Sequence, residues 1–123
     1  MPAQRRTVLL LEDEPLLSWD LEDMMRDAGV GEPIVLSSCS AASAWLDANS
    51  PDVAVLDIML SDGEATTVAQ TLLERGVPFV VHSAHSRWDS LTDPVFLQGV
   101  WVSKLCDPDL LIGAVTDCLA SRN

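Results

Sequence analysis

The chain has 123 residues, 48% of them apolar, and its 19 Asp and Glu residues outnumber 7 Lys and Arg residues, which gives a formal net charge of −12. This length suits one domain with its own core, so we expect a single folding unit over residues 1–123 with no room for a second domain. The acidic charge argues against direct binding to nucleic-acid backbones or anionic membranes and favours cations and basic protein surfaces.

No apolar run approaches the roughly 18 residues that a membrane-spanning helix needs, and the basic start is not followed by a signal-peptide core, so we expect a cytoplasmic protein. The three cysteines, Cys39, Cys106 and Cys118, show no metal-ligand spacing and cannot all pair with one another. That pattern fits a reducing compartment, and we interpret them as packing residues.

Short apolar runs alternate with helical patterns along the chain. Residues 7–11, 34–36, 53–56, 79–81 and 100–102 are predicted strands. The first helix is expected from Pro15 to Gly29, with an inward stripe of Leu17, Leu21, Met24 and Ala28. Further helices are expected before Asn49, before Gly76 and from about Asp107, whereas residues 84–99 favour only an irregular or shortened fourth helix.

Five strands joined by connections too long for hairpins predict a parallel sheet covered on both faces. The fold class is therefore α/β and doubly wound. The common strand order for five strands is 2-1-3-4-5, whose switch point lies between the first and third strands.

Those two strands both end in acids. Glu12 and Asp13 follow the first, and Asp57 follows the third, so the sheet order brings their carboxylates to one pocket. Any one of these acids alone is explained as a helix cap or turn residue. Together they are costly, because two unit charges about 4 Å apart repel by about 4 kcal/mol at an effective dielectric near 20, and an all-oxygen set suits Mg²⁺.

The fourth and fifth strands end in Ser83 and in Lys104, the only lysine of the chain. A hydroxyl and an ammonium should thus face the same pocket as the acids. Acids that hold a divalent ion, a carboxylate that can act as a nucleophile, a hydroxyl and a cation together suit a phosphoryl group. His82 and His85 also lie near this edge, but their spacing does not direct both toward one metal.

Four segments in order, residues 11–15, 55–60, 82–84 and 101–104, resemble the response-regulator receiver domain of two-component signalling, of the stand-alone single-domain type. The resemblance implies a flavodoxin-like fold and a phosphoprotein that is a switch and not an enzyme, with at most slow self-dephosphorylation. It implies that Asp57 accepts a phosphoryl group from a sensor histidine kinase or a histidine phosphotransfer protein and then acts on an unknown downstream protein.

The resemblance also implies roles for the other site residues. Asp13, Asp57 and the backbone carbonyl of Met59 would ligate Mg²⁺, and Glu12 would act through water. Ser83 matches the switch hydroxyl and Lys104 the partner of the phosphoryl oxygens. Trp101 stands where the family has its switch aromatic residue.

One residue departs from the family pattern, and two others are candidates for tuning the chemistry. Leu105 follows Lys104 where proline is usual, and because a cis bond before a non-proline residue costs about 3 to 4 kcal/mol, we predict a trans bond there. We hypothesise that Met59 and His85 tune the lifetime of the phosphoaspartate by controlling the access of water.

Two alternatives remain open. One is a pseudo-receiver, a phosphate-independent protein-docking module. The other is an aspartyl-phosphate hydrolase of the haloacid dehalogenase type, which the lack of an Asp-x-Asp pair after either acidic strand disfavours.

Overall fold

The computed structural model describes residues 6–84, 93–104 and 107–122. Five parallel strands form one sheet in the order β2-β1-β3-β6-β7, which confirms the predicted 2-1-3-4-5 arrangement of the main strands. The strands are β1 (Thr7–Leu11), β2 (Glu32–Leu36), β3 (Val53–Leu56), β6 (Phe79–Ser83) and β7 (Val100–Ser103).

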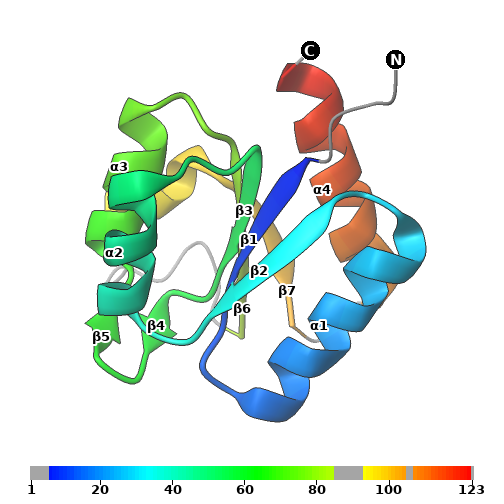
Figure 1. Ribbon diagram of the computed structural model, residues 1–123, viewed down its shortest axis with the longest axis horizontal. Coiled ribbons are helices and arrows are strands. Elements are labelled where there is room, and N and C mark those ends of the chain that lie inside the picture. Colours follow the sequence, from blue (N-terminus) through cyan, green and yellow to red (C-terminus); the bar gives the residue numbers. More distant parts are fainter. Residues whose placement is uncertain (1–5, 85–92, 105–106, 123) are drawn as a thin grey trace.

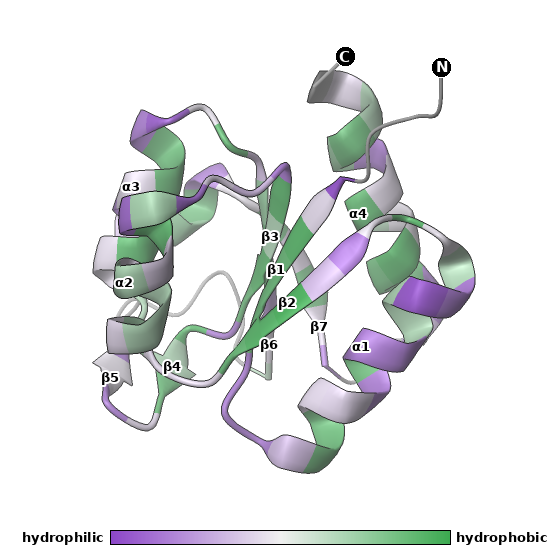
Figure 2. Cartoon of the chain, viewed as in Figure 1, coloured by the Kyte–Doolittle hydropathy of each residue, from purple (hydrophilic) through white to green (hydrophobic). Residues whose placement is uncertain are grey.

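Helices cover both faces of this sheet (Figure 1). One face carries α1 (Pro15–Ala28) and α4 (Pro108–Arg122), and the other carries α2 (Cys39–Ala48) and α3 (Thr66–Glu74) with the short 3₁₀ helix η1 (Pro94–Gln98). An apolar cluster lies on each side of the sheet. Figure 2 shows the resulting layers, with hydrophobic strands at the centre and hydrophilic residues on the outer surfaces.

Burial on both faces explains the continuous apolar runs of the central strands. All four residues of β3 are buried, and so are the last four residues of β1. No water reaches these side chains, so a polar residue there would lose its hydration. The first charged residue after each strand therefore marks where the chain leaves the sheet.

The first helix begins and ends as predicted, but one residue of its inward stripe was wrong. Pro15 opens α1, and Gly29, at φ 67°, closes it with its N–H on the carbonyls of the last turn. Leu21 and Met25 are buried, whereas Ala28 is exposed. By the 3.6-residue period Ala28, seven residues after Leu21, is on the same side of the helix, so its exposure follows from its place as the last residue of α1, next to the Gly29 cap.

Between β3 and α3 the chain forms a small antiparallel hairpin that the sequence did not predict. Its strands are β4 (Met59–Leu60) and β5 (Gly63–Glu64), and Gly63 adopts φ 131°, a conformation that side chains disfavour. The hairpin follows the end of β3 directly, so its position is tied to that edge of the sheet.

The region of the predicted irregular helix is described only in part, because residues 85–92 lie outside the described residues. The described remainder is η1, a 3₁₀ helix whose Phe96 is fully buried. Gly99 then lets the chain pass close to β6, since a Cβ there would lie 2.6 Å from the ring of Phe79. Over the described segments, no helix has both the length and the apolar character to cross a bilayer.

Candidate functional site at the carboxyl edge of the sheet

Three carboxylates meet where β1 and β3 end. Leu11 lies opposite Leu56 in the parallel pairing, and the N–H of Asp57 donates to the Leu11 carbonyl at 3.0 Å, so the pairing continues one residue beyond β3. One oxygen from each of Glu12, Asp13 and Asp57 lies within 4.8 Å of the others. The predicted convergence of these acids is therefore present in the structure.

Lys104 supplies a cation to this cluster. Its Nζ lies 2.8 Å from Asp57 Oδ2 and 3.0 Å from Glu12 Oε1. Its backbone N–H donates to the Ser83 carbonyl at 3.0 Å, which holds the end of β7 against the end of β6. Burial lowers the pKa of Lys104, but its hydrogen bonds and charge interactions with Asp57 and Glu12 outweigh burial and raise the pKa overall, so the ammonium is charged at neutral pH.

One lysine does not neutralise three acids. At a separation of 4.8 Å and an effective dielectric of about 20, each pair of carboxylates repels by about 3.5 kcal/mol. A hard divalent cation fits such an all-oxygen set at a solvent-accessible edge. Glu12 is nearly fully buried and already uses both oxygens, Oε1 on Lys104 and Oε2 on the Glu14 N–H at 3.1 Å. The carboxylates of Asp13 and Asp57 are thus the better candidates for direct ligands.

The other predicted site residues lie on β4, β6 and β7. Ser83 is buried at the end of β6 and lies opposite Ser103 of β7. Met59 follows in β4 with half of its side chain exposed. Trp101 packs against the apolar cluster under α2 and α3, and its indole N–H donates to the Phe96 carbonyl of η1 at 2.8 Å.

Two predictions cannot be placed. His85 and the bond between Lys104 and Leu105 lie outside the described residues. The roles expected for them stay predictions.

Comparison with known proteins identifies the fold. No protein-family model matches the chain, and no curated protein matches it. Solved structures do match: the receiver domain of a Francisella response regulator has a TM-score of 0.80 at 19% identity and covers 96% of this chain and 99% of its own. A two-component response regulator from Clostridium difficile has a TM-score of 0.81 at 21% identity, with 97% and 99% covered.

A third match is the response regulator TrrA from Thermotoga maritima, solved in complex with Mg²⁺-BeF. Its TM-score is 0.81 at 20% identity, and the match covers 93% of this chain and 99% of the other. This chain has the response-regulator receiver fold. Identities near 20% establish the fold alone, so any chemistry must be argued from the residues of this chain.

The hairpin that follows Asp57 contains an acid whose role the sequence did not predict. Asp62, in the turn between β4 and β5, accepts hydrogen bonds from the backbone N–H groups of Cys39 at 2.8 Å and Ser40 at 3.0 Å. These bonds lower the pKa of Asp62. The Asp62 carboxylate therefore caps the first turn of α2 and ties the loop that carries Met59 to a helix. Asp62 and Cys39 are 23 positions apart, so no local sequence pattern predicts this hydrogen bond.

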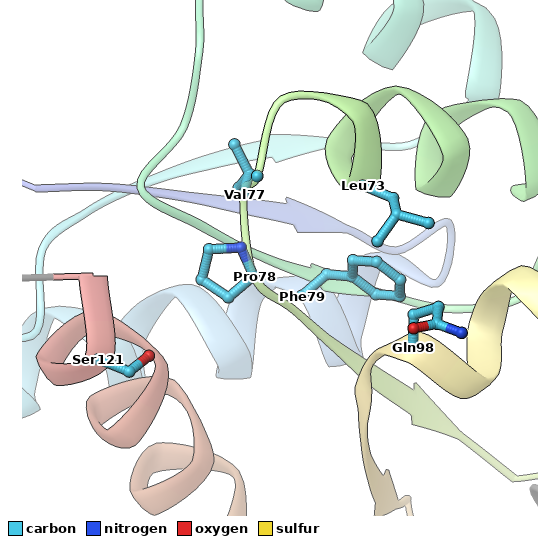
Figure 3. Close-up of a pocket in the computed structure, with 7 residues that line it drawn as sticks. Leu73, Val77, Pro78, Phe79, Gln98 and Ser121 are labelled. Atoms are coloured by element: carbon cyan, nitrogen blue, oxygen red, sulfur yellow. The ribbon is translucent and has the colours of Figure 1, made fainter.

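A pocket lies away from the acid cluster. It has a volume of about 450 Å³ and is lined by Leu73, Gly76, Val77, Pro78, Phe79, Gln98 and Ser121 (Figure 3). Phe79 begins β6 whereas Ser83 ends it, so this hollow is at the opposite end of the strand from the acids. None of its lining residues within the described part of the chain is charged, and we assign it no chemistry.

Proposed function

We propose that this protein is a phosphorylation-dependent signalling switch that accepts a phosphoryl group at Asp57. The observation that carries the proposal is the ammonium of Lys104 held between Asp57 and Glu12, at 2.8 and 3.0 Å, beside a cluster of three carboxylates. A nucleophilic oxygen, a cation beside it and an all-oxygen metal set are the groups that phosphoryl transfer to a carboxylate needs.

The transfer is a displacement at phosphorus. An oxygen of Asp57 forms the new O–P bond while the P–N bond of a phosphohistidine donor breaks, and the electron pair of that bond leaves on the imidazole of the donor. The donor is a sensor histidine kinase or a histidine phosphotransfer protein. Lys104, already next to Asp57 Oδ2, neutralises charge on the phosphoryl oxygens.

The metal of this reaction would be Mg²⁺, and Asp13, Asp57 and the backbone carbonyl of Met59 would hold it, with Glu12 acting through water. The fit rests on the carboxylate oxygens gathered within 4.8 Å and on the cation deficit of the cluster. The TrrA receiver, whose structure is a complex with Mg²⁺-BeF, supports the same choice of ion. When bound, the ion supplies positive charge that draws the anionic donor toward the acids.

Phosphorylation then changes the charge of the pocket by about −1.5 to −2. We propose that the hydroxyl of Ser83 and the ammonium of Lys104 turn to the new oxygens. Trp101, two residues before Ser103 on the same strand, transmits the change through its hydrogen bond to the Phe96 carbonyl. The output is an altered contact with a downstream protein, not turnover of a substrate.

The lifetime of the phosphoaspartate sets how long that contact lasts. Met59 is two residues after Asp57, and its side chain is 52% exposed. We propose that Met59 and His85 limit the approach of water to the phosphoryl group. Equal decay rates of the phosphorylated parent, Met59→Asn and His85→Ala proteins would remove this role.

The test is incubation of the protein with Mg²⁺ and acetyl phosphate, followed by intact mass and phosphate release. We expect a gain of one phosphoryl group that Asp57→Asn abolishes, that EDTA prevents and that Asp47→Asn, an exposed carboxylate on α2, leaves unchanged. No gain in the parent protein would instead indicate the pseudo-receiver. Rapid multiple turnover without accumulation would indicate the aspartyl-phosphate hydrolase.

A further inference from the structure

A cavity of about 130 Å³ lies behind the phosphoacceptor pocket, between α1, α4 and the ends of β6 and β7. Its apolar wall consists of Leu17, Leu21, Met24, Val102 and Leu111. His82 and Lys104 line it from the sheet, and the exposed residues Asp20 and Asp107 line its solvent side. This α1–α4 cavity is distinct from the acid cluster, although Lys104 borders both.

His82 is the unusual residue in this cavity. Its side chain is 7% exposed, and its Nδ1 is a buried atom without a hydrogen-bond partner in the described structure. Val80, two residues earlier in β6 and in the apolar cluster on the same face, shows that a valine packs there without any polar group to satisfy. A buried imidazole nitrogen without a partner costs free energy, so its presence beside a cavity calls for an occupant that bonds to it.

The charge state of His82 narrows the choice of occupant. Burial and then the charge of Lys104 lower its pKa, and the smaller opposing effect of Asp57 does not reverse this. The imidazole is therefore neutral at pH 7 and has one donor and one acceptor nitrogen. A neutral ring can bond to a hydroxyl or to a ring N–H group.

The size of the cavity and the charges around it narrow the choice of occupant further. An engineered apolar cavity of roughly 150 Å³ takes up benzene, so a cavity near this size admits a single aromatic ring. The aliphatic walls of Leu21, Val102 and Leu111 suit the faces of such a ring. Asp20 and Asp107 repel an anion at the solvent side, and Lys104 repels a cation inside.

We propose that the α1–α4 cavity binds a neutral single-ring aromatic molecule with one hydroxyl or ring N–H group, hydrogen-bonded to His82. Binding needs no phosphoryl group at Asp57, so this proposal can be tested independently of the proposed function. It also assigns His82 a role that does not require His85.

The test uses the full chain, unphosphorylated and in EDTA, with phenol and benzene as probes in an amide NMR titration. We expect phenol to cause saturable shifts at Leu21, Val102 and Leu111, and benzene to bind about tenfold more weakly because it offers no hydrogen bond. In His82→Val the two probes should bind alike. Thermal unfolding of this variant checks that it is folded, and valine suits the neighbouring packing.

A second variant pair tests the location. Leu17 is only partly buried, so Leu17→Phe can fill the cavity without rebuilding the core, and we expect it to weaken phenol binding at least tenfold. Leu73→Phe, the same change beside the distant hollow, should leave phenol binding unchanged. The proposal is overturned if phenol gives no saturable shifts, as for a cavity that holds only water, or if phenol retains its advantage over benzene in His82→Val.

Discussion

Replacing Asp13 with asparagine should stabilise the metal-free protein. An oxygen of Asp13 lies within 4.8 Å of oxygens of Glu12 and Asp57, while the ion pairs of Lys104 go to those two residues. At an effective dielectric near 20, each of the two repulsions is about 3.5 kcal/mol. Because Asp13 reaches solvent and is screened by salt, we expect the measured gain in the free energy of unfolding to be about 1 to 2 kcal/mol.

The same substitution should remove the response to Mg²⁺. An ion that binds only the folded protein adds about 2.7 kcal/mol at 100 times its dissociation constant. Urea unfolding in EDTA and in Mg²⁺, followed by circular dichroism, measures both effects in one experiment. We expect the parent protein to gain stability with Mg²⁺ and Asp13→Asn to gain little. The stability difference between the two proteins should therefore narrow or reverse in Mg²⁺.

Asp23→Asn is the matched control, since Asp23 is an exposed acid on α1 outside the cluster. It should change neither the stability in EDTA nor the response to Mg²⁺ by more than about 0.5 kcal/mol. If Asp13→Asn unfolds at lower urea than the parent in EDTA, the electrostatic reasoning is refuted. If it keeps the full Mg²⁺ response, Asp13 is not a ligand.

Three other predictions follow from single contacts. Lys104→Met should lower the free energy of unfolding in EDTA by about 2 kcal/mol, because the buried Glu12 loses its cation; no loss by urea titration would show that the ion pair is not stabilising. Burial, and then nearby Asp62, raises the pKa of the Cys39 thiol to about 11, so peptide mapping should show its alkylation rising about tenfold per pH unit from pH 8 to 10, and a plateau by pH 9 would contradict this. Gly99→Ala should cost about 1 to 3 kcal/mol, since the new Cβ would lie 2.6 Å from the Phe79 ring; an unchanged melting temperature would mean that the ring yields.

The sheet and the acid cluster could be predicted because both follow from short-range patterns and one topological rule. The apolar runs around Leu9 and Val55 are continuous because both faces of their strands are covered, and the first acid after each run marks the edge. Parallel order then places Asp13 and Asp57 together without any knowledge of side-chain contacts. The roles of these residues are a separate matter, which phosphorylation experiments decide.

The β4–β5 hairpin and the cap on α2 could not be predicted because they depend on tertiary contacts. Two-residue strands are too short for an alternating pattern, and the turn residues Ser61 and Asp62 equally suit a loop that opens a helix. The carboxylate of Asp62 can cap α2 only after folding has brought the hairpin next to the N–H of Cys39. The partners of Glu12 show the same limit, since the sequence does not tell which of its oxygens bonds Lys104.

The acid cluster is more easily understood as an incompletely neutralised site than as a stable one. Lys104 pairs with Glu12 and Asp57, yet the cluster keeps two carboxylate charges in excess. A site built for stability would use more cations or fewer acids, and a protein tolerates such excess where binding a ligand removes it. We propose that this excess draws a divalent cation, which together with Lys104 lets an anionic donor approach. In the function proposed above, the same three carboxylates that weaken the metal-free fold give the site its affinity for the ion on which the proposed phosphoryl transfer depends.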